Sequence, residues 1–329
     1  MSPSTNMATP LTNLTPTNLN LAASKPLLIA ASPTTTVRQV LTLMAEHNIT
    51  SLPLRSHNSD AIVSIVNVYD VATYIINAAC FTEINPQSLD SEKLARLDDP
   101  IENVLGLETE RESYRIFKTD AHEPLYETLA AFSRGIHRSL VIDYTITGTP
   151  APPWLLSQTD IIRYINKHPE SIAALGIDLD APLADVPGLL HPDREVVSAR
   201  EDESALNVYR KMAQAEKLGI AVVDRDDNLV ANLSASDLRS IDFKAFDNLI
   251  LPVLEFLKVI ATNPSRPLAL ITATPKTTLR DLVRALTEND VHRVWVVEAE
   301  GSRRLVDVVT QSDVVGVVVA RAKAARESV

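Results

Sequence analysis

Three hydroxyl residues each precede an aspartate by three positions, directly after an apolar stretch: Ser157 with Asp160, Ser234 with Asp237, and Thr310 with Asp313. A weaker copy has Asn67 with Asp70. This spacing is typical of a helix start, where the hydroxyl caps the helix and the carboxylate favours its dipole. A carboxylate also presents two acceptor oxygens, so it could hold two adjacent donors of a ligand.

Further hydroxyls lie beside these aspartates. Thr159, Ser236 and Ser312 each come immediately before the acidic residue, whereas the weaker copy has Tyr69 there. Hydroxyls and free backbone N–H groups at a helix N-terminus can bind phosphate. The fourth copy is therefore the strongest candidate site, and the first is the weakest.

Two His-Arg dipeptides, His137-Arg138 and His292-Arg293, occur at the same place in the second and fourth copies. Each stands at the entry to a predicted strand, where alternation directs neighbouring side chains to opposite faces. Arginine suits bidentate contact with phosphate, and histidine can donate as well. Arg163, one turn after Asp160, is a further candidate cation.

These motifs close four copies of one pattern: a strand, a helix with apolar residues at helical spacing, two strands and a second helix. The sequence therefore predicts a mixed α/β fold of four β-α-β-β-α repeats. The predicted segments are a disordered tail rich in Ser, Thr, Asn and Pro (1–25), repeat 1 (26–80), a connector (81–113), repeat 2 (114–168), a linker between halves (169–194), repeat 3 (195–241), a helical connector (242–266) and repeat 4 (267–329).

Composition excludes several classes of function. The formal net charge of −11 disfavours nonspecific binding to nucleic acid or to an anionic membrane, so an anionic ligand needs local cations. Cys80 is the only cysteine, which excludes a disulfide framework and a cysteine-based zinc site. With 8 glycines, the chain has none of the glycine-rich phosphate-binding motifs. No signal peptide or membrane span is expected, so we predict a cytoplasmic or nucleocytoplasmic protein.

The repeat order and the closing Ser/Thr-x-x-Asp resemble the CBS motif, named from cystathionine beta-synthase. Four copies, with His-Arg in the second and fourth, resemble the gamma subunit of AMP-activated protein kinase. The resemblance implies that repeats pair through their sheets into two Bateman modules, which stack into a disk whose clefts bind adenine nucleotides. The stretches LSASDLRSI and LILPVLEFLKV also look like fungal and plant four-CBS proteins, some of which are described as regulators of protein phosphatases.

The resemblance also implies roles for the motif residues. The ribose-binding residues would be Asp70, Asp160, Asp237 and Asp313. The phosphate-binding residues would be His137, Arg138, Arg163, His292, Arg293, Ser157, Thr159, Ser234, Ser236, Thr310 and Ser312. Helix capping is the competing interpretation of each aspartate, and both roles can hold at once. Departures are Thr50, where the gamma subunits have arginine, and Leu218 or Gly219, where the third repeat has no cation.

We therefore expect a non-catalytic protein that binds AMP, ADP or ATP and regulates a protein partner, such as a kinase or phosphatase complex. Another adenosyl ligand, such as S-adenosylmethionine, is an alternative. No cofactor, metal, nucleic acid or membrane is expected, and the chain is predicted to be a monomer or homodimer. The competing functions are an interaction scaffold with empty clefts, such as a phosphatase regulator, and an enzyme with an unrecognised site.

Overall fold

The predicted order of elements is confirmed in repeats 2, 3 and 4 and, apart from the first strand, in repeat 1. Repeat 1 contains α1 (Val37–Glu46), β1 (Ser51–Ser56), β2 (Ser59–Asn67) and α2 (Val68–Cys80). Repeat 2 contains β3 (Lys118–Asp120), α4 (Tyr126–Ser133), β4 (Arg138–Ile142), β5 (Trp154–Ser157) and α5 (Gln158–Lys167). Repeat 3 contains β6 (Ser198–Arg200), α7 (Ala205–Gln214), β7 (Gly219–Val223), β8 (Leu229–Ser234) and the 3₁₀ helix η7 (Ala235–Ser240). Repeat 4 contains β9 (Thr272–Ala273), α9 (Leu279–Glu288), β10 (Arg293–Val297), β11 (Leu305–Thr310) and α10 (Gln311–Glu327).

Each sheet is small and has the same topology. In repeats 2, 3 and 4 the middle strand pairs in parallel with the first strand and antiparallel with the third. In repeat 1 the predicted first strand over residues 27–31 is reduced to one parallel bridge between Ala31 and Leu54. Leu27 in that stretch is 88% exposed, so it cannot stabilise a strand by burial.

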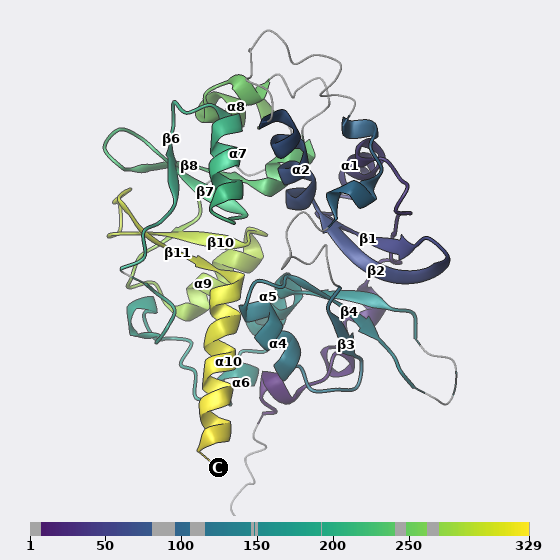
Figure 1. The fold of residues 1–329 in the computed structure, drawn as a ribbon. Coiled ribbons are helices and arrows are strands. Elements are labelled where there is room, and N and C mark those ends of the chain that lie inside the picture. The colour runs from purple at the N-terminus through teal and green to yellow at the C-terminus, as the bar shows by residue number, and fades with distance from the viewer. Residues whose placement is uncertain are drawn as a thin grey trace, which may run out of the picture. The chain divides into compact units, whose positions relative to one another are not determined.

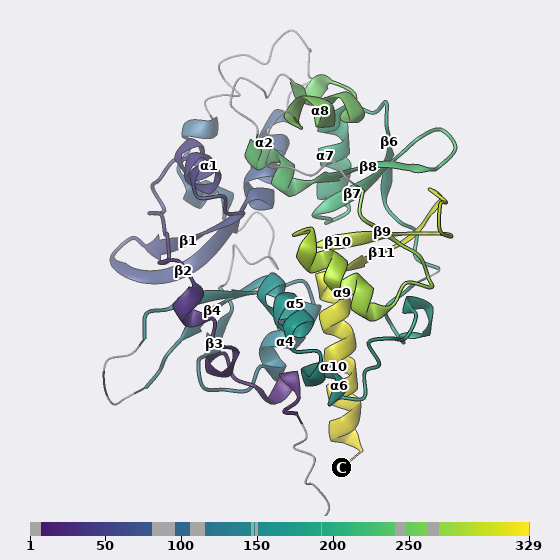
Figure 2. The same cartoon turned by 180° about the vertical axis from the view of Figure 1, so that it is seen from behind.

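This computed structural model describes residues 8–80, 96–105, 116–145, 148, 151–191, 193–240, 248–261 and 270–328 (Figures 1 and 2). The chain divides into two compact units. Unit 1 comprises Met1–Leu28, Phe117–Glu195 and Ile271–Val329, and unit 2 comprises Ile29–Ile116 and Val196–Leu270. Unit 1 thus combines repeats 2 and 4, and unit 2 combines repeats 1 and 3.

Within each unit the two repeats meet through helices. In unit 1, α5 packs on α9, and α10 packs on both α4 and α5 (Figure 1). In unit 2, α2 packs on α7 and η7, and α1 also contacts η7. Pairing of repeats through their sheets, which the resemblance implies, stays a prediction. Segment 169–194, predicted to separate two halves, lies wholly within unit 1.

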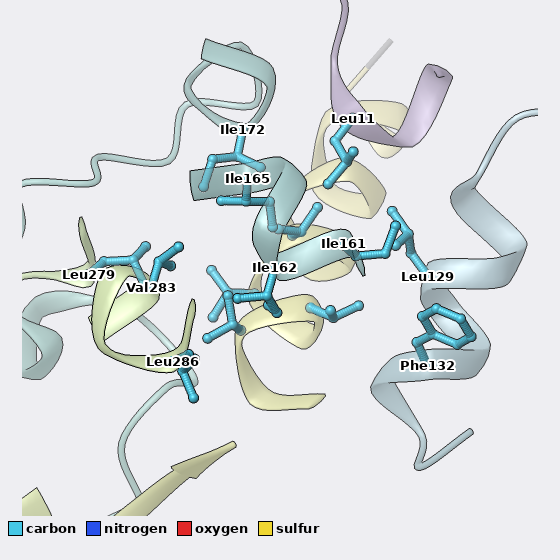
Figure 3. Packing of buried hydrophobic residues seen from close by; sticks show 14 of the residues in the cluster. Leu11, Leu129, Phe132, Ile161, Ile162, Ile165, Ile172, Leu279, Val283 and Leu286 are labelled. Carbon is cyan, nitrogen blue, oxygen red and sulfur yellow. The ribbon is translucent and has the colours of Figure 1, made fainter. Parts of the chain in front are cut away.

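The core of unit 1 shows why its repeats pair. α5 is amphipathic, and Ile161, Ile162 and Ile165 are fully buried. These isoleucines lie between Leu129 and Phe132 of α4 and a row of apolar residues on α9 (Figure 3). Burying each such side chain stabilises the unit by about 1.5–3 kcal/mol relative to leaving it exposed. Neither repeat could cover this surface alone.

A proline turn that the sequence reading missed recurs four times. Each turn has a proline followed by a fully buried apolar residue and then a short helix: Pro10-Leu11, Pro100-Ile101, Pro182-Leu183 and Pro252-Val253. The short helices are η1 (Leu11–Asn13), η5 (Ile101–Val104), η6 (Leu183–Asp185) and α8 (Val253–Ile260). Three of the prolines bridge to the residue that caps the first helix of a repeat. The turns at Pro100, Pro182 and Pro252, which fall within predicted connectors, are therefore parts of the repeats.

The N-terminal segment supplies the turn of repeat 2. Leu11 is 0% and Leu19 5% exposed, and both lie in the core of unit 1. The backbone N–H of Leu125, at the start of α4, donates to Leu14 O (2.8 Å). The N–H and hydroxyl of Thr17 both donate to Ala121 O (3.1 and 2.7 Å). Residues 8–25 are thus ordered, contrary to the predicted disordered tail, of which residues 1–7 lie outside the described part of the chain.

Candidate functional site

All four repeat aspartates cap a helix. In each repeat the carboxylate accepts a hydrogen bond from the backbone N–H three residues earlier. The pairs are Asn67 to Asp70 (2.9 Å), Ser157 to Asp160 (2.8 Å), Ser234 to Asp237 (2.8 Å) and Thr310 to Asp313 (2.7 Å). At α5 and α10 the hydroxyls of Ser157 and Thr310 accept from the aspartate N–H, which completes a capping box. The capping interpretation is confirmed at every repeat.

The aspartates differ in exposure. Asp70 and Asp237 are 5% exposed and Asp160 is 7% exposed, whereas Asp313 is only half-buried. At Asp313 a single oxygen, Oδ2, takes both the N–H and the hydroxyl of Thr310, each at 2.7 Å. Capping therefore uses one edge of this carboxylate. Asp313 is the repeat aspartate best placed to accept hydrogen bonds from a ligand.

The His-Arg pairs lie one strand away from the capping hydroxyls. The carbonyl of His137 accepts from Gln158 N (3.0 Å), and that of His292 accepts from Gln311 N (3.1 Å). Across the antiparallel pairing, Arg138 is opposite Ser157 and Arg293 is opposite Thr310. The His-Arg pairs, which were predicted to bind phosphate, thus lie beside the start of α5 in repeat 2 and of α10 in repeat 4.

The same backbone contact identifies the equivalent residues in unit 2. Val68 N donates to Thr50 O (3.0 Å), and Ala235 N donates to Leu218 O (3.1 Å). Thr50 and Leu218 therefore occupy the positions of His137 and His292. The sequence left Leu218 and Gly219 open for this position, and the register assigns Leu218.

Two buried glutamines join the helix starts of unit 1. Gln158 Nε2 donates to Ser312 Oγ (2.8 Å), and Thr159 Oγ1 donates to Gln311 Oε1 (3.1 Å). Gln158 Nε2 also bonds the Phe132 and Ile136 carbonyls (2.7 and 3.2 Å). Each of the two helices that end a repeat, α5 and α10, thus contributes one glutamine and one hydroxyl to the contact between their first turns. Thr159 and Ser312, predicted to bind phosphate, thus hydrogen-bond between the repeats.

In repeat 3 the predicted phosphate-binding hydroxyls are occupied locally. Ser234 Oγ donates to Leu218 O (3.2 Å) and lies 3.0 Å from Ser236 Oγ. The segment after Ser234 is 3₁₀ rather than the predicted α-helix. The hydroxyls of Ser234 and Ser236 therefore form hydrogen bonds within repeat 3, at the start of η7.

Arg163 and Lys25, both in unit 1, have carboxylate partners. Arg163 Nη2 lies 2.8 Å from Asp290 Oδ1, and the two side chains are 55% and 73% exposed. Such an exposed ion pair contributes little to stability, so a phosphate could compete for the guanidinium. Lys25 Nζ lies 2.6 Å from Asp160 Oδ2. Sequence reasoning missed this second pair because it joins residues 135 positions apart.

Among the residues that the structure describes, no group of three or more His, Cys, Asp or Glu side chains could hold a metal ion. Within the same ranges, no helix combines the length and apolar character needed to cross a bilayer.

Comparison with known proteins gives the family. The sequence model of the CBS domain matches residues 23–77, 183–243 and 264–320, just over half of the chain. Protein SDS23 of Yarrowia lipolytica is 25% identical over 297 residues, covering 86% of this chain and 57% of that protein. Protein SDS23 of Saccharomyces cerevisiae is 24% identical over 242 residues, covering 71% and 43%. This chain spans about half the length of these relatives.

The fold is also that of a solved structure. Protein MJ1225 of Methanocaldococcus jannaschii, described as a proposed archaeal homologue of g-AMPK, superimposes with a TM-score of 0.65. The match covers 88% of this chain and 96% of MJ1225, at 19% sequence identity. At that identity, the likeness establishes a shared fold.

Proposed function

Since this chain belongs to the CBS-domain family, we propose that it is a non-catalytic regulatory protein whose repeat sites bind AMP, ADP or ATP. Binding would bias the protein toward one conformation and so signal adenylate levels to a protein partner. A ligand can shift such an equilibrium only by its differential affinity for the two states. The proposed archaeal g-AMPK homologue of the same fold is in keeping with this function.

The observation that carries the proposal is the arrangement around Asp313. Its carboxylate uses Oδ2 for the cap and is only half-buried. The two vicinal hydroxyls of a ribose match the geometry of a carboxylate acceptor. The site also lies at the N-terminus of α10, whose dipole favours an anion.

Nearby cations suit a phosphorylated ligand. Arg293 is opposite Thr310 in the β10–β11 pairing, and His292 precedes it. His137 and Arg138 hold the same position in repeat 2. Because the chain carries a formal charge of −11, a nucleotide must find a local concentration of positive charge, and we assign that role to these four residues.

Unit 2 favours a second candidate function, that of an interaction scaffold. Its aspartates, Asp70 and Asp237, are 5% exposed and cap helices, and Thr50 and Leu218 stand in place of cations. A unit of this kind can support a partner surface without a nucleotide. The identity of the partner, in a kinase or a phosphatase complex, belongs to the same proposal.

The test is nucleotide binding by Asp313→Asn. Asparagine keeps one acceptor for the Thr310 cap but loses the charge, so the helix start should survive. We expect AMP affinity to fall about ten- to a hundredfold, the loss of about 1.5–3 kcal/mol typical of a hydrogen bond to a charged group. Isothermal titration calorimetry measures it, and mass spectrometry of small molecules released from the purified protein identifies the native ligand.

The matched control is Asp281→Asn. Asp281 caps α9 in the same repeat, with Thr278 Oγ1 donating to Asp281 Oδ2 at 2.8 Å and accepting from Asp281 N at 3.1 Å. It shares the capping chemistry but lies at the other helix of the repeat. Its AMP affinity should stay unchanged. If both variants lower only thermal stability, the aspartate of repeat 4 is a cap and the scaffold function is favoured.

A further inference from the structure

The carboxylate of Asp160 is paired with a lysine from the N-terminal segment. Lys25 Nζ lies 2.6 Å from Asp160 Oδ2, with the two side chains 21% and 9% exposed. The ammonium group is also 6.0 Å from the centroid of the Trp154 ring, within range of a cation–π interaction. Lys25 is therefore a largely buried cation, and its partner Asp160 is the residue predicted to bind ribose in repeat 2.

Repeat 4 provides the matched comparison. Asp160 and Asp313 each belong to a capping box of the same kind, at α5 and at α10. In each box Oδ2 of the aspartate accepts from the N–H and the hydroxyl of the capping residue, Ser157 or Thr310. Asp160 Oδ2 accepts the Lys25 ammonium as a third donor. Three donors at 2.6–2.8 Å thus lie around Oδ2, and Asp160 is 7% exposed, whereas Asp313 is half-buried. A ribose would have to displace the lysine to reach the carboxylate of Asp160.

We propose that Lys25 is the specificity-determining residue of unit 1: it occupies the ribose position at Asp160, so that a nucleotide binds at Asp313 and is excluded from Asp160. The inference rests on the proposed function, since it assigns which of two equivalent carboxylates takes the ligand. The ammonium group replaces the hydroxyl donors of a ribose and neutralises the carboxylate charge at the same time.

The fold holds Lys25 in place. Leu11 and Leu19 anchor the preceding segment in the core of unit 1, and Thr17 is fixed on Ala121 O by two hydrogen bonds. Lys25 directly follows the last short helix of that segment, η3 (Ala22–Ser24). Because the lysine is tethered, it competes with a free ligand at a high effective concentration.

Lys25 also lies close to the passage of the chain from one unit to the other. Leu28 is the last residue of unit 1 and Ile29 the first of unit 2. Only Pro26 and Leu27 separate Lys25 from Leu28. The ion pair with Asp160 therefore holds the end of the N-terminal segment just before the chain passes into unit 2.

The experiment counts nucleotide sites in the full chain by calorimetry with AMP. Lys25→Met removes the ammonium and keeps a long apolar stem. We expect it to add one site compared with the parent protein, with at least about tenfold tighter binding there, and Asp160→Asn in the same chain should remove that site. Lys167→Met, which takes the same charge from the exposed end of α5, should leave the count unchanged.

Each other outcome overturns the inference in a distinguishable way. If the parent protein binds AMP at Asp313 but Lys25→Met adds no site, Lys25 does not occlude Asp160. If Lys25→Met weakens binding, the lysine contacts the ligand instead. If no variant binds AMP, the proposed function fails as well. A double-mutant cycle of Lys25→Met and Asp160→Asn in urea, without nucleotide, tests the contact separately, and additive shifts of the unfolding midpoint would contradict it.

Discussion

Unit 1 and unit 2 use the same helix cap but surround it with different residues. The first residues of the closing helices are Gln158 and Gln311 in unit 1, and Val68 and Ala235 in unit 2. The glutamines are 4% and 2% exposed and tie the two helix starts together through Thr159 and Ser312. Unit 2 packs its helices through apolar residues at these positions.

The residues before the middle strands also differ between the units. His137 and His292 of unit 1 correspond to Thr50 and Leu218 of unit 2, since each carbonyl accepts the N–H of the first residue of the closing helix. The aspartate is common to all four repeats, whereas a His-Arg pair stands at the start of the middle strand only in the two repeats of unit 1. The aspartate therefore caps a helix in every repeat, and the proposed binding of an anionic ligand depends on the neighbouring cations of unit 1.

The substitution expected to separate the two units most strongly is Leu11→Ala, which should destabilise unit 1 alone. Leu11 is fully buried in unit 1, and removing such a side chain typically lowers the free energy of unfolding by about 2–5 kcal/mol. Hydrogen exchange should become faster in α4, α5 and α10 and stay unchanged in α7. Leu27→Ala, at a position 88% exposed, should change stability by less than about 0.5 kcal/mol. Equal effects of the two variants would mean that the N-terminal segment is not part of unit 1.

Gln158→Ala should lower the free energy of unfolding by a smaller amount. It tests the glutamine contacts between the helix starts of unit 1, which unit 2 replaces with apolar residues. The change removes donors from the Phe132 and Ile136 carbonyls and from Ser312 Oγ. Leaving buried acceptors unpaired should cost about 1–3 kcal/mol, measured by urea unfolding. Gln214→Ala, at the exposed end of α7, is the control. A cost as small as that of the control would show that the cross-links of unit 1 are dispensable.

The sequence predicted the features that depend on short spacing. Hydrophobic periodicity and the Ser/Thr-x-x-Asp motif located the repeats and the helix starts, because capping is decided within one turn. The N-terminal segment was misread because Leu11 and Leu19 are isolated among Ser, Thr, Asn and Pro. Proline followed by an apolar residue at 10, 100, 182 and 252 links that segment to the other repeats, but Pro53-Leu54 and Pro124-Leu125 have the same pattern, so the sequence alone did not single out the turns.

Features that depend on tertiary contact were beyond sequence reasoning. Gln158 and Gln311 resemble any first-turn glutamine until their helices meet. Lys25 and Asp160 are 135 positions apart, and nothing local connects them. Segment 169–194 is rich in proline and reads as a linker, although Leu183 in its turn is fully buried.

The most direct test of the central claim is ligand discrimination by the double variant Arg138→Ala and Arg293→Ala. Adenosine, AMP and ATP are titrated into the parent and variant proteins at two salt concentrations. We expect the variant to lose its preference among the three ligands while adenosine binding largely survives, since only phosphates would meet these side chains. Phosphate-dependent affinity should also fall with salt in the parent, and less steeply in the variant. An unchanged phosphate preference in the variant would contradict the account.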